Sequence, residues 1–202
     1  MAEIKQISKE DVEALLLLNE GHFADLKGKA ITPAKFTKAV SAFANAGGGE
    51  IYVGIEELEG VDGKERTWDG FDDPEAANAF FQVVHELDPL SKNFSMQFLQ
   101  ADGAKGLVLH VTVSKTQNIT AASDGRIYIR SNASSLPVKD DALERLRYDK
   151  GIQTYEDELL GLDSVEITNS ETIIEFLIET IPTGEPEDWL TKQFVLQQKN
   201  QQ

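Results

Sequence analysis

The sequence predicts an α+β domain, with a mixed sheet of about five strands flanked by helices, followed by an acidic helical extension. Three observations predict this architecture. Short runs of alternating apolar residues mark strands, apolar residues at helical spacing recur between them, and beyond Gly151 the pattern changes to acidic helices. We therefore expect one domain over residues 1–150 and an extension over 151–202. The extension ends without a helix-stop residue, as the cut-short start of a following region would.

The N-terminal quarter of the chain predicts two helices and two strands. Ser8 and Asp11 have the spacing of a capping box, which starts a helix that runs through Leu18. Thr32, followed by proline, is a typical N-cap for a second helix over 33–45. The predicted strands cover 22–27, with Phe23 packed inward, and 50–55.

The middle of the chain predicts one loop, two helices and three strands. Residues 56–72 are polar and contain glycine, so we expect a long loop there. Proline after Asp73 starts a helix. This helix covers 74–87, and a second helix is predicted over 140–148. Strands are predicted over 94–100, 107–113 and 126–130. The extension adds helices over 170–181 and 187–198.

Composition excludes several function classes. The chain has no cysteine, which rules out disulfides, thiol nucleophiles and cysteine-based zinc sites. The longest apolar run is far too short to cross a membrane, and the N-terminus lacks a signal-peptide pattern, so we expect a cytoplasmic protein with no membrane partner. Nineteen basic and 35 acidic residues give a net charge of −16, which disfavours indiscriminate binding to phosphate backbones. Residues 25–49 and 105–147 are nevertheless net positive.

Two patterns of residues indicate chemistry. Alternation places Arg126, Tyr128 and Arg130 on one face of a strand, which suits phosphate pairing with aromatic stacking on single-stranded nucleic acid. The alternative is a half-exposed sheet face with acidic partners on the neighbouring strand. Two pairs of carboxylates lie near the ends of neighbouring predicted elements. Glu20 and Asp25 lie across a helix end and a strand, and Glu56 and Glu57 follow the next strand. Magnesium-dependent nucleases hold their metal with carboxylates placed in this way. The alternative is a solvated acidic surface.

Two other motifs are better explained by structure than by ligand binding. His22, His85 and His110 lie on different elements, so a metal site built from them is not expected. The glycines at 47–49 follow a helix and precede a strand, the reverse of a phosphate-binding loop. They are expected to end the helix.

Three motifs together resemble one known family. They are Glu20-x4-Asp25-Leu26-Lys27, the run Ser41-Ala-Phe-Ala-Asn-Ala-Gly-Gly-Gly-Glu-Ile-Tyr-Val-Gly-Ile55, and Ile127-Tyr-Ile-Arg-Ser131. In this order they are similar to the Schlafen AlbA-type domain, over about residues 10–148. The sequence departs from the family pattern at Asp25-Leu26, where Glu-Phe is usual, at Ala46, where threonine is usual, and at Asn132, where glycine is common.

The resemblance implies an α/β sandwich-like domain at the N-terminus of bacterial proteins described as transcriptional regulators or DNA-binding proteins. The family has also been catalogued as a divergent AAA ATP-binding domain, but this sequence has no Walker A loop, so ATP is not expected as a cofactor. In related animal proteins three acidic residues cut transfer RNA. The matching positions here are Glu20, Asp25 and either Glu56 or Glu57.

We therefore expect a nucleic-acid-binding module, for DNA or RNA, that needs no cofactor. We expect Lys27, Lys29, Arg126 and Arg130 to contact phosphates. Tyr128 is expected to stack on a base. One alternative is an endoribonuclease that uses Glu20, Asp25 and Glu56 with Mg²⁺ or Mn²⁺. Another is a protein-interaction domain, whose acidic helices dock a second copy or the C-terminal domains of a longer chain.

Overall fold

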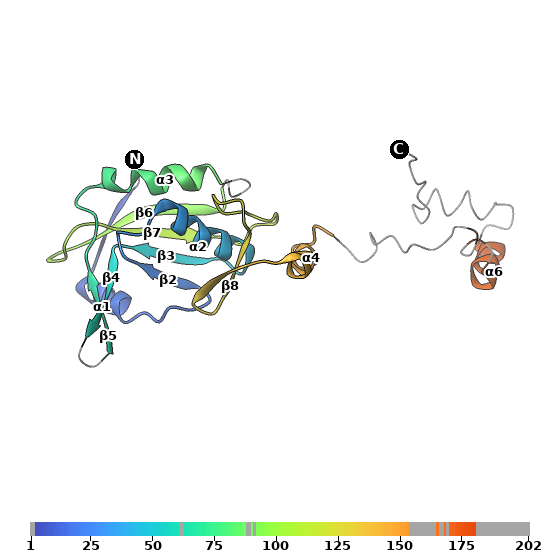
Figure 1. Ribbon diagram of the computed structural model, residues 1–202, viewed down its shortest axis with the longest axis horizontal. Coiled ribbons are helices and arrows are strands. Elements are labelled where there is room, and N and C mark those ends of the chain that lie inside the picture. The colour runs from blue at the N-terminus through green and yellow to red at the C-terminus, as the bar shows by residue number, and fades with distance from the viewer. Residues whose placement is uncertain are drawn as a thin grey trace. The chain divides into compact units, whose positions relative to one another are not determined.

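The computed structural model describes residues 3–60, 63–87, 90, 92–153, 165, 168 and 170–180. The chain divides into two compact units, residues 1–155 and 156–202, whereas the sequence predicted a boundary at residue 150. In the second unit the described structure includes one helix, α6 (Glu171–Thr180), where a helix over 170–181 was expected (Figure 1). The helix expected over 187–198 lies outside the described residues.

The first unit is built on a mixed five-stranded sheet, as the fold class predicts (Figure 1). The strand order is β1-β6-β7-β3-β2, with β1 parallel to β6, β2 parallel to β3, and the other two pairings antiparallel. The bounds are β1 (Ile4–Ile7), β2 (Ala24–Lys27), β3 (Gly49–Val53), β6 (Phe94–Ala101) and β7 (Val108–Val113). β2 and β1 are therefore the two edges of the sheet.

One face of the sheet carries the main core. The helices α2 (Pro33–Asn45) and α3 (Asn78–His85) pack there, with a short 3₁₀ turn, η1 (Pro74–Ala77), before α3. α2 starts where the sequence predicts, because the Thr32 hydroxyl accepts a hydrogen bond from the Lys35 backbone N–H at 3.3 Å and proline follows as the first helical residue. Phe36 and Phe43 of α2 are fully buried against this face.

The other face of the sheet has a smaller core under α1 (Lys9–Leu16). The predicted capping box is confirmed, since Ser8 and Asp11 exchange side-chain to backbone hydrogen bonds of 3.0 and 3.1 Å. Leu15 of α1 packs with Leu26 and other apolar residues of this face. Because α1 is short, part of this face stays open, and both pockets described below lie on this side.

The prediction of a loop over residues 56–72 is wrong for most of that range. β4 (Ile55–Gly60) and β5 (Gly63–Trp68) form an antiparallel hairpin, in which Glu56 pairs with Thr67 and Glu57 with Arg66. The segment is polar because much of the hairpin is solvent-accessible, so its composition is that of a loop although its backbone is extended. Gly54, at φ +115°, turns the chain from β3 into this hairpin.

The fifth strand of the sheet is also not the predicted one. Residues 126–130 were expected to join it, but β8 (Tyr128–Ser131) pairs with β9 (Ser134–Pro137) in a separate two-stranded sheet. β1 takes the edge position instead, and its mostly exposed side chains show why no apolar pattern predicted it. Phe23, expected to pack inward, is 67% exposed.

The first unit ends with α4 (Asp140–Asp149), close to the predicted range of 140–148. Its last turn is attached to the core through Lys150, whose ammonium donates to the carbonyls of Ala44 and Thr116 at 3.1 and 2.7 Å. Within the described part of the chain, no helix has the length and apolar character needed to cross a membrane.

Candidate functional site

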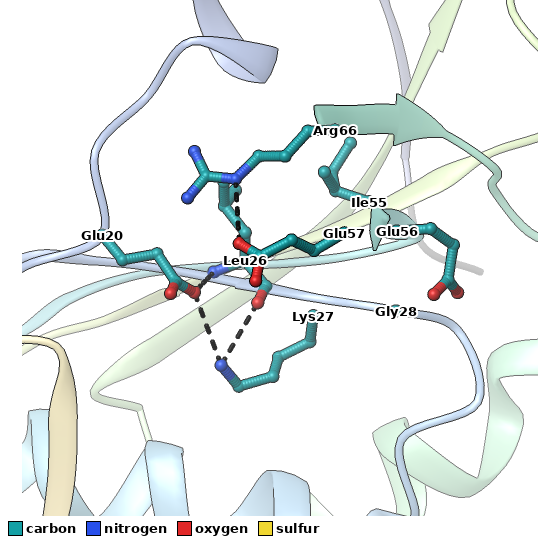
Figure 2. Close-up of a pocket in the computed structure, with 8 residues that line it drawn as sticks. All are labelled: Glu20, Leu26, Lys27, Gly28, Ile55, Glu56, Glu57 and Arg66. Carbon is teal, nitrogen blue, oxygen red and sulfur yellow. Dashed lines mark hydrogen bonds and ion pairs between the residues drawn. The ribbon is translucent and has the colours of Figure 1, made fainter. Parts of the chain in front are cut away.

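Three glutamates and two basic residues line a pocket of about 280 Å³ beside the edge strand β2 (Figure 2). They come from segments far apart in the sequence. Glu20 precedes β2 and Lys27 ends it, while Glu56, Glu57 and Arg66 belong to the β4–β5 hairpin. The hairpin that sequence analysis missed is therefore what closes this pocket.

Glu20 and Arg130 cap the outward-facing backbone of β2. A Glu20 carboxylate oxygen accepts a hydrogen bond from the Leu26 N–H at 2.8 Å. Arg130 donates to the carbonyls of Gly21 and Ala24 at 2.9 and 3.0 Å. An edge strand with unpaired N–H and C=O groups would recruit another strand, so these two side chains protect the edge. This structural role exists whatever else the two residues do.

Asp25 points inward from β2 and is completely enclosed. Its carboxylate Oδ1 accepts from Arg130 Nη2 at 3.0 Å and from Lys27 Nζ at 2.8 Å, and the side chains of Asp25 and Arg130 are each 1% exposed. Among the described atoms, the second oxygen, Oδ2, is buried with no hydrogen-bond partner. Burial raises the pKa of Asp25, while the neighbouring charges of Lys27 and Arg130 act in the opposite direction.

Lys27 connects Asp25 to the pocket. Its ammonium lies 2.8 Å from Asp25 Oδ1 and 3.5 Å from Glu20 Oε1, so Lys27 forms ion pairs with both carboxylates. Figure 2 shows Lys27 beside Glu20 at the pocket. The side chain is about one-third exposed. Lys27 is therefore accessible from solvent, whereas Asp25 behind it is not.

Glu56 and Glu57 occupy different sides of the pocket. In Figure 2 the carboxylates of Glu20 and Glu57 lie on one side, and that of Glu56 lies on the other, beside Gly28. Glu56 accepts a hydrogen bond from the Lys29 backbone N–H at 3.0 Å, in space that a Cβ at Gly28 would occupy. Glu57 lies 3.6 Å from Arg66 Nε, and the Arg66 guanidinium also donates to the Leu18 carbonyl.

The three predicted metal ligands do not form a metal cage as they stand. Glu20 and Asp25 converge, but on the Lys27 ammonium, and Glu56 lines the pocket while Asp25 does not. Within the described residues, no group of three or more acidic or histidine side chains is arranged to hold a metal ion. A divalent cation at Glu20 and Asp25 would have to displace Lys27.

Arg126, Tyr128 and Arg130 were predicted to share one strand face and to contact nucleic acid, but the structure buries Tyr128 and Arg130. Tyr128 and Arg130 do share a face of β8, but that face is buried. The Tyr128 hydroxyl donates to Asp124 at 2.8 Å, and the Arg130 guanidinium lies over the Phe43 ring at 4.8 Å. Arg126 is exposed, and roughly 13 Å of extended chain separates it from Arg130.

The two positive stretches of the sequence meet at Asp69. Lys29, from residues 25–49, lies 2.9 Å from one Asp69 oxygen, and Lys105, from residues 105–147, lies 2.7 Å from the other. The bonds from Lys105 and Lys29 lower the pKa of Asp69. Sequence analysis missed Lys105 and Arg66, because Lys105 lies in a hairpin connection and Arg66 in a segment expected to be a loop.

Comparisons with known proteins agree with the order of these motifs. Residues 20–139 match the family described as Schlafen, AlbA_2. No curated protein matches the sequence.

Two solved structures are similar in part. One is the N-terminal domain of a protein from Nitrosomonas europaea described as related to the ATP-dependent DNA helicase RecG, with 20% identity and a TM-score of 0.45 over 53% of this chain and 72% of that one. The other is the DIP2311 protein from Corynebacterium diphtheriae, with 16% identity and a TM-score of 0.46. That match covers 90% of this chain but only 35% of the other.

Proposed function

The chain belongs to the Schlafen, AlbA_2 family, and from that premise we propose that its first unit is a nucleic-acid-binding module, more specifically a DNA-binding module of a bacterial transcriptional regulator. The observation that carries the proposal is the meeting of basic residues from two distant segments beside one pocket. Lys29 and Lys105 share Asp69, and Lys27 lies at the adjoining pocket with its side chain partly accessible. Lysines gathered in this way neutralise phosphates without reading sequence.

The proposal changes the roles of the predicted binding residues. Lys27, Lys29 and Arg126 are accessible and are assigned to phosphate contact, together with Lys105. Arg130 and Tyr128 are assigned to holding β8 in place, because both side chains are buried.

The overall charge of the chain sets an upper limit on affinity. A net charge of −16 repels phosphate at long range, so binding by this chain is weak and falls steeply with salt. Further domains or a second copy of the chain would raise the affinity by adding a second contact.

The test is fluorescence anisotropy of labelled single-stranded RNA and duplex DNA over a range of salt concentrations. Lys29→Ala and Lys105→Ala should each weaken binding to all sequences alike and reduce the salt slope by about 1. Lys92→Ala removes the charge of an exposed lysine at the opposite end of the β6–β7 pair from Lys105, and serves as the control. Equal losses in all three variants, or no binding at low salt, would overturn the proposal. Binding of a protein partner that is insensitive to salt would favour the interaction-domain alternative.

A second candidate is a metal-dependent endoribonuclease, and one observation favours it. Asp25 has an unpartnered buried oxygen, and it shares a cation with Glu20, so two carboxylates already face one positive charge. Glu20→Gln and Glu56→Gln are the appropriate variants, because glutamine can still accept the hydrogen bonds from the Leu26 and Lys29 N–H groups. Cleavage of RNA that requires Mg²⁺ or Mn²⁺ and is lost in both variants, with binding retained, would establish this candidate. Intact RNA after incubation of the natural chain with either metal would refute it.

A further inference from the structure

A second cavity, of about 480 Å³, lies between α1 and the sheet, on the face opposite α2 and α3. Its floor is a row of polar side chains from three adjacent strands. Tyr52 on β3 pairs with His110 on β7, and His110 pairs with Gln97 on β6. Leu15, Leu18 and Leu99 supply apolar walls. Nothing in the function proposed above uses this cavity.

The row is ordered around His110. Its ring stacks on Tyr52, with centroids 4.5 Å apart and planes 3° from parallel. Gln97 Nε2 lies 3.0 Å from His110 Nδ1, and with the amide nitrogen as donor the ring proton is on Nε2. Burial lowers the pKa of His110, which keeps the ring neutral. Nε2 is buried without a hydrogen-bond partner among the described atoms, and it faces Glu50 Oε1 at 3.6 Å.

Among the described residues, Glu50 forms no ion pair with a lysine or an arginine. Its Oε2 accepts from the Tyr52 hydroxyl at 2.6 Å, and the neutral His110 beside Oε1 supplies no positive charge. The side chain is 45% exposed, so the carboxylate remains accessible from the cavity. Lys5 and Asp11 also line the cavity, and with Glu50 they give its lining a net charge of −1. The cavity therefore disfavours a phosphate and favours a group that donates N–H bonds.

We infer that this cavity binds a guanine base, with the Glu50 carboxylate accepting from the base's neighbouring ring N–H and amino group. A carboxylate offers two acceptor oxygens in one plane, which matches two adjacent donors. The leucine walls cover the flat ring, and a cavity of this size has room for one base. Tyr52 and His110 are positioning residues, since they orient Glu50.

The inference deepens the proposed function and rests on it where the base belongs to a nucleic-acid strand. Leu18 connects the two pockets, because it borders this cavity and its carbonyl accepts from Arg66 of the first pocket. In this proposal, a single strand held by Lys27 at the first pocket places one of its bases in the second. A flipped-out base read on its hydrogen-bonding edge is a common mode of recognition.

The experiment compares guanosine with inosine, which lacks only the amino group. Isothermal titration should show guanosine binding, and inosine binding weaker by roughly tenfold or more, since a hydrogen bond to a charged group is lost. Glu50→Gln should abolish this discrimination, and Tyr52→Phe should reduce it. Glu75→Gln makes the same chemical change at an exposed site before α3, and should leave the discrimination intact.

Oligonucleotides separate this inference from the proposed function. A uridine oligomer tests phosphate binding alone, because uracil lacks the two adjacent donors. If that oligomer binds but guanosine and inosine bind equally or not at all, the cavity inference is wrong and the proposed function stands. If guanosine is discriminated but no oligomer binds at low salt, the cavity is a site for a free nucleoside and the proposed function is wrong.

Discussion

Replacement of Asp25 by asparagine should destabilise the first unit by about 3 kcal/mol, because it leaves the Arg130 charge buried and unpaired. Breaking a buried ion pair by removing one partner costs about 3–5 kcal/mol, and both side chains here are 1% exposed. The lower end of that range applies, because Arg130 keeps its bonds to the Gly21 and Ala24 carbonyls. Lys27 loses a partner too, but its ammonium is accessible and water can solvate it.

Urea and thermal unfolding of the full chain, followed by near-ultraviolet circular dichroism, measure this change. For a unit of this size, a loss of about 3 kcal/mol corresponds to a fall in melting temperature of roughly 6–12 °C. Asp102→Asn makes the same chemical change at an exposed position and should shift the midpoint little. The double variant Asp25→Asn with Arg130→Met should be more stable than the sum of the single losses predicts, because the two residues are in contact.

A loss below about 1 kcal/mol for Asp25→Asn would refute the reasoning, since an exposed pair contributes no more than that. Additive losses in the double variant would refute it as well. Either result would mean that the Asp25–Arg130 ion pair contributes little to holding β8 against β2.

Three further predictions concern single positions. A methyl group at Gly28 would overlap the Glu56 carboxylate, so Gly28→Ala should displace Glu56 from the Lys29 N–H. The substitution should lower the free energy of unfolding in urea by about 1 kcal/mol or less and alter any metal-dependent cleavage. A change in stability of several kcal/mol would contradict this. Because burial lowers the pKa of His110 below its usual 6.5, the unfolded chain binds more protons just below pH 6.5. Stability should therefore fall as pH drops through that region, and His110→Gln should flatten the profile. Asn132 sits at φ +51° in the β8–β9 turn, so Asn132→Ala should cost about 1 kcal/mol in thermal unfolding while Asn132→Gly changes little; equal effects would argue against a left-handed turn.

The sequence alone predicted the elements whose signals are local. The capping box at Ser8 and the Thr32-Pro33 helix start involve residues within one helical turn of each other, and both are observed. Alternation predicted β3, β6 and β7, because these strands have a buried apolar face. β1 and the β4–β5 hairpin escaped prediction because their accessible side chains carry no such pattern.

The candidate site was predicted in its composition but not in its geometry. Glu20, Asp25 and Lys27 were identified from a motif, and the structure brings them within contact of one another. The sequence could not show that Asp25 is enclosed, because its partner Arg130 is 105 residues away. Alternation shows that two side chains share a strand face, but only packing decides whether that face meets solvent or the core.

What the sequence determined by itself is therefore the set of helices and strands with local signals, and the residue types near the site. Tertiary structure decided which of those residues meet. Lys29 and Lys105 converge on Asp69 because the sheet and the β4–β5 hairpin bring three distant segments together. Caps and periodicities depend on neighbours a few residues apart, whereas burial, ion pairing and cavities depend on strand order and register, which no short stretch of sequence contains.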